Sequence, residues 1–127
     1  MKFLVVEDSG MKRYFINNFF EGKNTELHFV GSVNPGILYA VQNKDELSGI
    51  ILDLGLATLD DSMDYADQRG LDLVVELKRQ KINIPVLINS TTIIDLDCVM
   101  EVYPFVKGQM KFPNDYSTLE SFISSLQ

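Results

Sequence analysis

The sequence predicts an α/β fold: a doubly wound, five-stranded parallel sheet with helices on both faces, in the (βα)5 order. Three observations predict it. Five short apolar segments alternate with five segments whose apolar residues recur at helical spacing. Most of the apolar segments are continuous, which is typical of strands that are buried on both faces. The helical segments between them supply the right-handed crossovers that parallel strands require.

The first two strands are expected over 3–6 and 27–30, where apolar residues are concentrated. Ser9 is a suitable N-cap for a helix between them that continues to about residue 20. Within this helix, three residues four apart are expected to face the core: Met11, Phe15 and Phe19.

The third strand is expected over 49–52 and ends at Asp53. Before it, Asn34 and Pro35 predict the start of a helix, with the proline at its first position. After it comes an irregular segment, 54–69, for which a solvated loop is the commoner interpretation. Four aspartates lie there: Asp60, Asp61, Asp64 and Asp67.

The last two strands are expected over 83–88 and 106–112. Gly70 opens the helix before them, with Leu71, Val74 and Leu77 on one face. Either Thr91 or Thr92 can cap the helix between them. The final helix has apolar residues at i, i+3, i+4 and i+7: Leu119, Phe122, Ile123 and Leu126.

Length and charge bound the class of protein. A chain of 127 residues and 14.4 kDa fits one domain, 1–127, and 46% hydrophobic residues indicate a folded core. A net charge of −7 argues against direct nucleic-acid binding. No apolar run suits a membrane span, and the acidic start does not resemble a signal peptide. The single cysteine, Cys98, is expected to be a small buried hydrophobe in a reduced, cytoplasmic protein.

Acidic residues follow two of the predicted strands directly. Glu7 and Asp8 end the first strand and Asp53 ends the third. Parallel strands place their carboxyl ends at one edge, where ligands bind at the switch in strand order. Clustered carboxylates repel unless a cation lies between them, and oxygen ligands suit Mg²⁺. At the same edge, Ser90 follows the fourth strand and Lys111 ends the fifth.

These segments resemble the receiver domain of bacterial two-component response regulators, the CheY-like single-domain type. The resemblance rests on KFLVVEDSGMKR, IILDLGL, IPVLINSTT and MKFP, in this order and over essentially the whole chain. It implies phosphorelay signal transduction in which Asp53 accepts a phosphoryl group. It also implies that Asp8, Asp53 and the Gly55 carbonyl bind Mg²⁺, that Glu7 acts through water, and that Ser90 and Lys111 contact the phosphoryl group.

The resemblance also implies the partners. We expect a sensor histidine kinase or phosphotransfer protein as the donor and a downstream protein as the target. A monomer or weak dimer is expected, and at most self-catalysed phosphoryl transfer rather than a true enzyme. Three residues depart from the family pattern: Thr91 after Ser90, Gly108 at the aromatic switch position, and Phe112 after Lys111. Lys107 is the alternative candidate for the lysine of the family.

Other interpretations remain open. Taken singly, Asp8 and Ser9 could be a helix start, Asp53 a turn residue and Lys111 a solvated lysine. The main rival is a pseudo-receiver, an interaction module that works without phosphorylation. A Mg²⁺-dependent phosphohydrolase would need a second aspartate where Gly55 stands, and a flavodoxin-like cofactor binder would need a phosphate loop after the first strand.

Overall fold

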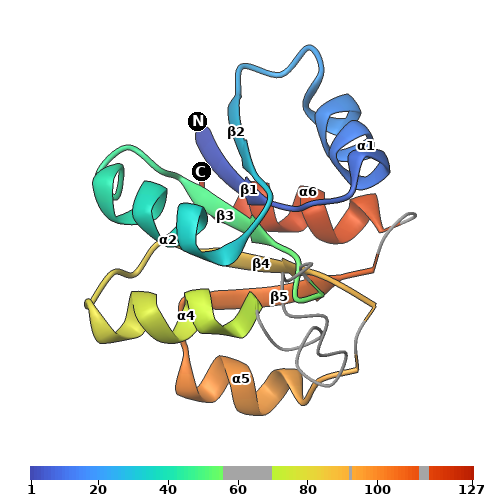
Figure 1. The fold of residues 1–127 in the computed structure, drawn as a ribbon. Coiled ribbons are helices and arrows are strands. Elements are labelled where there is room, and N and C mark those ends of the chain that lie inside the picture. Colours follow the sequence, from blue (N-terminus) through green and yellow to red (C-terminus); the bar gives the residue numbers. More distant parts are fainter. Residues whose placement is uncertain (56–69, 92, 112–114) are drawn as a thin grey trace.

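A computed structural model shows one parallel sheet with helices on both faces (Figure 1). It describes residues 1–55, 70–91, 93–111 and 115–127. The four aspartates within 56–69, and Thr92, Phe112 and Pro113, therefore lie outside the described residues. The strands are β1 (Lys2–Val6), β2 (Glu26–Val30), β3 (Gly49–Leu52), β4 (Val86–Asn89) and β5 (Val106–Met110). Their order is β2-β1-β3-β4-β5, and every neighbouring pair is parallel. The predicted fold class is confirmed.

The helices lie in two layers. They are α1 (Gly10–Phe20), α2 (Val33–Gln42), α4 (Gly70–Arg79), α5 (Leu96–Val102) and α6 (Tyr116–Ser125). Helices α1 and α6 cover one face of the sheet, and α2, α4 and α5 cover the other (Figure 1). Each layer closes a separate half of the core.

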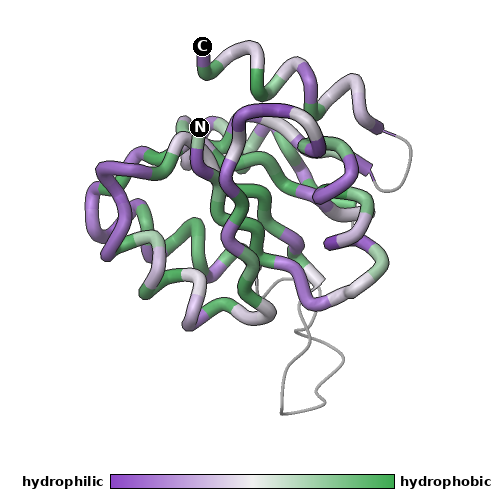
Figure 2. The backbone as a smooth tube through the Cα atoms, turned by 90° about the horizontal axis from the view of Figure 1, so that it is seen from above, coloured by the Kyte–Doolittle hydropathy of each residue, from purple (hydrophilic) through white to green (hydrophobic). Residues whose placement is uncertain are grey.

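Side-chain alternation divides the central strands between these two halves. In β1, Leu4 and Val6 pack toward α2, α4 and α5, whereas Phe3 and Val5 pack toward α1 and α6. Strands β3 and β4 are likewise buried along their whole length, and the sheet interior is the most hydrophobic part of the chain (Figure 2). Continuous apolar segments are therefore the correct pattern for strands covered on both faces.

The first helix turns a different face inward than its spacing predicted. Ser9 caps α1 as expected, and its side chain accepts the Lys12 N–H. However, the buried side chains are Ile16 and Phe20, while Met11 is 64% exposed. The predicted inward stripe was therefore right only in part: Phe19 packs against the core and stacks on Tyr116 of α6, whereas Met11 faces solvent.

Two other helices begin at different residues than predicted. Helix α2 starts at Val33 after the N-cap Ser32, which places Pro35 within its first turn rather than at its first position. Helix α5 starts after Asp95, whose carboxylate accepts the Cys98 N–H at 3.1 Å. Cys98 itself is exposed, so the expectation that it is buried was wrong.

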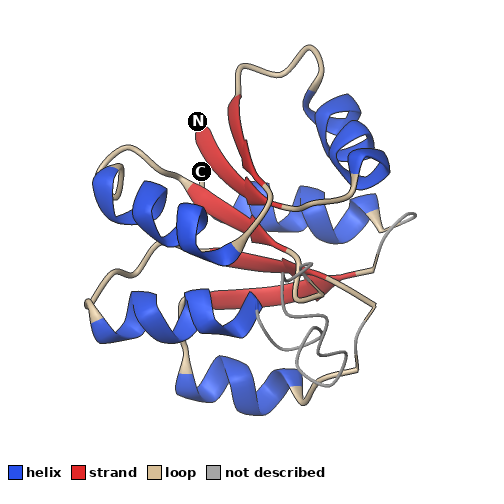
Figure 3. Ribbon diagram, viewed as in Figure 1, coloured by secondary structure: helices blue, strands red, loops and turns tan. Residues whose placement is uncertain are grey.

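The strand order reverses between β1 and β3. The chain passes from β1 outward to β2 and then returns to the other side of β1 to form β3. The loops after the strands gather at one edge of the sheet (Figure 3). In folds of this kind the reversal leaves a crevice at the carboxyl ends of the two strands. None of the helices in the described ranges has the length and hydropathy that crossing a bilayer requires.

Candidate metal centre at the carboxyl edge of the sheet

Backbone pairing fixes the acidic residues at the strand reversal. The Glu7 N–H donates to the Val30 carbonyl at 2.9 Å and so continues the β1–β2 pairing. The Asp53 N–H donates to the Val6 carbonyl at 3.0 Å and continues the β1–β3 pairing. Both carboxylates therefore leave a rigid part of the backbone rather than a free loop.

The structure brings three predicted residues together. Glu7, Asp8 and Asp53 each offer a carboxylate oxygen, and these oxygens lie within 4.8 Å of one another. Glu7 and Asp53 are buried, with 1% and 4% of their surface exposed, whereas Asp8 is exposed. We call these three residues the acidic cluster. Two carboxylates are held in the protein and the third opens the cluster to solvent.

The cluster is electrostatically strained at Glu7. The pKa of Glu7 is raised to about 8, chiefly by burial and next by the nearby Asp53 charge. Its Oε2 accepts the Ser9 N–H at 3.1 Å, but its buried Oε1 has no hydrogen-bond partner among the described residues. A carboxylate oxygen left in this way is available to a cation.

The donor set fits a small hard divalent cation. Mg²⁺ prefers oxygen ligands, uses one or two carboxylates and retains several waters. The acidic cluster offers such oxygens, and its exposed member leaves room for water. Gly55 is exposed, and its N–H donates to Asp53 Oδ1 at 3.1 Å. That bond closes a turn directly after β3, and the ligand role of the Gly55 carbonyl stays a prediction.

A lysine that the sequence analysis did not single out lies beside the cluster. The Lys12 Nζ is 3.7 Å from Asp53 Oδ2 and 3.9 Å from Glu7 Oε1. Lys12 is three residues after the N-cap Ser9, and helical side chains lean toward the N-terminus of the helix. That position, one turn beyond the acidic pair, was the signal in the sequence.

The other two predicted site residues are placed differently from each other. Ser90 is buried at the end of β4, where its N–H donates to the Met110 carbonyl at 3.1 Å. Lys111 is exposed after β5, and its N–H donates to the Asp115 carboxylate at 3.2 Å. Within the described ranges, the ion pairs to the buried carboxylates come from Lys12 and none comes from Lys111. The roles of Ser90 and Lys111 stay predictions.

Asn89 lies at the same edge, at the end of the fourth strand, and the sequence assigned it no role. The β3–β4 register pairs Leu52 with Ile88, so Asn89 continues β4 beside Asp53. Its side chain is fully buried, and neither amide atom has a partner among the described residues. A polar residue at the end of an otherwise apolar strand was the available signal.

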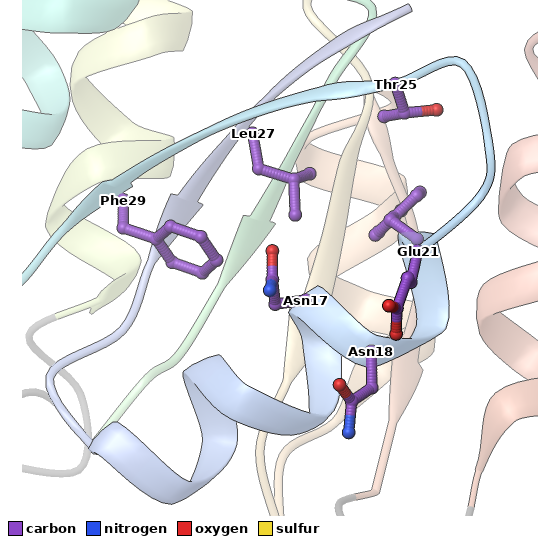
Figure 4. Close-up of a pocket in the computed structure, with 7 residues that line it drawn as sticks. Asn17, Asn18, Glu21, Thr25, Leu27 and Phe29 are labelled. Carbon is purple, nitrogen blue, oxygen red and sulfur yellow. The ribbon is translucent and has the colours of Figure 1, made fainter.

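A separate hollow lies between α1 and the edge strand β2. It has a volume of about 350 Å³, and Asn17, Asn18, Glu21, Thr25 and Leu27 are among the residues that line it (Figure 4). None of its lining residues belongs to the acidic cluster. The hollow is therefore distinct from the crevice where the carboxylates meet.

Comparison with solved structures identifies the fold. A signal receiver domain from Vibrio parahaemolyticus matches with a TM-score of 0.77 and 18% identity, over 98% of this chain and 88% of that one. The chemotaxis protein CheY4 of Vibrio cholerae matches with a TM-score of 0.73 and 16% identity, over 99% of this chain and 98% of that one. A response regulator receiver domain from Clostridium thermocellum matches with a TM-score of 0.74 and 20% identity, over 98% of this chain and 92% of that one. The chain has the receiver-domain fold.

Sequence comparison adds nothing to this structural match. No protein-family model matches the chain, and no curated protein matches it. The receiver fold is thus established by structure at identities near one residue in five. In this fold the strand reversal lies between β1 and β3, where the acidic cluster is found.

Proposed function

We propose that this chain is a Mg²⁺-dependent receiver that accepts a phosphoryl group on Asp53 and switches protein–protein interactions in a phosphorelay. The observation that carries the proposal is the acidic cluster, three carboxylates within 4.8 Å at the strand reversal of a receiver fold. The donor would be a histidine kinase or phosphotransfer protein, and the target a downstream protein.

The proposed reaction is a single transfer. An Asp53 carboxylate oxygen attacks the phosphorus of a phosphohistidine, the new O–P bond forms, and the N–P bond breaks with imidazole as the leaving group. Bound Mg²⁺ would neutralise charge on the transferred phosphoryl oxygens. Asp8 and Asp53 would hold the ion directly, and Glu7 would act through water. Ser90 and Lys111 would contact the phosphoryl oxygens.

The placement of Asp53 supports its role as nucleophile. Its Oδ1 accepts the Gly55 N–H, so the carboxylate is held in one orientation by the turn that follows it. Its Oδ2 is on the side of Lys12, at 3.7 Å from the ammonium. A fixed carboxylate with a cation beside it suits the arrival of an anionic phosphoryl group.

Mass spectrometry after incubation with acetyl phosphate and Mg²⁺ tests the proposal. Wild type should gain one phosphoryl group, and Asp53→Asn should gain none. Asp97→Asn, which changes an exposed aspartate on α5, is the matched control and should be labelled like wild type. Equal labelling of Asp53→Asn would place the acceptor elsewhere, and no labelling of wild type would contradict the proposal.

The alternative is a pseudo-receiver that works without phosphorylation. One observation favours it: Lys12 places a positive charge beside two of the three carboxylates, where a metal ion would otherwise do so. A pseudo-receiver would show neither acetyl phosphate labelling nor stabilisation by Mg²⁺. The same labelling experiment therefore separates the two functions.

A further inference from the structure

Lys12 occupies an unfavourable position for a lysine unless the acidic cluster compensates for it. It lies in the first turn of α1, and no acidic residue of α1 itself lies in that turn. The helix dipole concentrates positive charge at this end, so a lysine there is disfavoured and an acid is preferred. The compensating negative charge comes from Asp53, and from Glu7 when it is ionised, and both residues directly follow strands.

The two contacts that Lys12 makes with the buried carboxylates are ion pairs without a hydrogen bond. Its Nζ lies 3.7 Å from Asp53 Oδ2 and 3.9 Å from Glu7 Oε1, within ion-pair range but beyond normal hydrogen-bond length. About a quarter of its side chain is exposed, at 26%. The buried Glu7 Oε1 keeps no hydrogen-bond partner among the described residues even with Lys12 in place. Lys12 offsets the negative charge of the cluster but leaves the hydrogen-bonding capacity of Glu7 Oε1 unused.

The neighbouring basic residue is committed elsewhere. The Arg13 Nε donates to the Glu7 backbone carbonyl at 2.6 Å, and its guanidinium lies 5.6 Å from the Phe29 ring centre. Arg13 therefore braces the backbone between β1 and β2. Of the two consecutive cations, Lys12 is the one that faces the carboxylate oxygens.

We propose that Lys12 is a built-in competitor of the divalent cation, which holds the acidic cluster together in the metal-free protein and withdraws toward solvent when the ion binds. This inference rests on the proposed metal site. A magnesium ion would lie about 2.1 Å from its oxygen ligands. The Lys12 ammonium, 3.7 Å from Asp53 Oδ2, would then face a divalent charge at close range, which is strongly repulsive.

The competition sets how much Mg²⁺ the domain requires. With Lys12 present, part of the attraction of the carboxylates for the ion is already satisfied, so the measured affinity is lower than the ligand set alone would give. The flexible stem and partial exposure of Lys12 allow the ammonium to swing away without disturbing α1. Lys12 is thus a positioning and tuning residue for the metal rather than a ligand.

Titration calorimetry with Mg²⁺ alone, on the full chain, tests the inference. Lys12→Met keeps most of the apolar stem and removes the charge. We expect it to bind Mg²⁺ about five- to tenfold more tightly than wild type. Lys12→Arg keeps the charge and should remain close to wild type. The matched control is Lys44→Met, which removes an exposed lysine between α2 and β3, at the amino edge of the sheet.

Thermal melts give a second readout. Metal-free Lys12→Met should melt below wild type, because two buried carboxylates lose their counter-ion, and its rise in melting temperature on adding Mg²⁺ should be larger. If Lys12→Met and wild type bind Mg²⁺ equally, or the variant binds more weakly, the inference is overturned while the metal site stands. If neither protein binds Mg²⁺, the proposed metal site fails and this inference fails with it.

Discussion

The carboxyl edge of the sheet has two halves: the β1–β3 half carries the acidic cluster, and the β4–β5 half carries Ser90 and Lys111. In the first half, Glu7 and Asp53 are buried and their backbones continue the strand pairing. In the second half, Ser90 is equally buried, but Lys111 is exposed and bonded through its backbone to Asp115. The side chains of the first half follow two central strands, β1 and β3, whereas Lys111 in the second half follows the edge strand β5.

The edge strand also changes register. Val86 pairs with Val106, but Leu87 pairs with Gly108, so Lys107 is an extra residue on β5. A bulge of this kind turns the following side chains toward the other face. No ring can occupy position 108, and Phe105 is instead buried in the core half on the side of α2, α4 and α5. If Asp53 is phosphorylated as proposed, an aromatic ring at position 108 cannot couple that event to β5.

The largest expected change in the free energy of unfolding is at Gly70, where α4 begins next to the end of β3. A Cβ built on Gly70 would meet the Asp53 carbonyl oxygen and would lie 2.7 Å from the Leu54 Cα. Backbone atoms cannot move away cheaply, so Gly70→Ala should lower the free energy of unfolding by at least about 3 kcal/mol. Urea denaturation measures this. Gly10→Ala is the control, because its Cβ would meet nothing within 4 Å. Equal effects of the two changes would contradict the tight contact.

The next effect is the pH dependence of the metal-free domain. The pKa of Glu7 is raised from 4.5 to about 8, so between these values the folded state binds more protons than the unfolded state. The contribution of Glu7 to the free energy of unfolding is therefore fully present below about pH 4.5, and it is lost as the pH rises toward 8. We expect a loss on the order of 2 kcal/mol, since the charge is shared with Asp53 and offset by Lys12.

Denaturation in EDTA across this pH range measures the loss. Glu7→Gln cannot ionise and should flatten the dependence, whereas Glu46→Gln, an exposed glutamate in a surface ion pair with Lys2, should leave it intact. Saturating Mg²⁺ favours ionised ligands and should offset the loss above about pH 7. An unchanged slope in Glu7→Gln would assign the titration to another group.

A smaller and opposite effect is expected at Asn89. Its buried amide has no partner among the described residues, and an unsatisfied buried polar group is destabilising. Asn89→Leu keeps the same branched arrangement of heavy atoms and should raise the free energy of unfolding by about 1 kcal/mol. Asn83→Leu, at an exposed position, should change it little. A clear loss of stability in Asn89→Leu would show that the amide has a partner, such as a buried water.

The smallest effect sharpens the contrast between the two halves. At Gly108 the nearest atom to an added Cβ is the Leu87 Cδ1, at an ordinary 3.8 Å. Gly108→Ala should therefore fit, and it should stabilise the domain by roughly 0.5 kcal/mol because glycine is entropically costly in a strand. The same substitution that disrupts the β1–β3 half at Gly70 is then favourable in the β4–β5 half. Thermal melts of the two variants side by side provide the measurement, and a destabilised Gly108→Ala would show that β5 is as tightly packed as the centre.

The sequence by itself determined the sheet and the acidic cluster. Continuous apolar segments require strands covered on both faces, and residues that directly follow such strands must meet at one edge. Glu7, Asp8 and Asp53 could therefore be placed together without coordinates, and the structure brings their oxygens within 4.8 Å. Local signals were equally reliable where the chemistry is local, as at Ser9, whose side chain caps α1.

Only the tertiary structure decided which helix face is buried, where the edge strand slips, and what lies above the carboxylates. Ile16 and Phe20 rather than Met11 face the core because α1 packs on β1 beside α6. The extra residue at Lys107 depends on how β5 docks on β4. The position of Lys12 depends on the angle at which α1 leaves the sheet. Each of these depends on how one element docks on another, and periodicity within one element does not contain it.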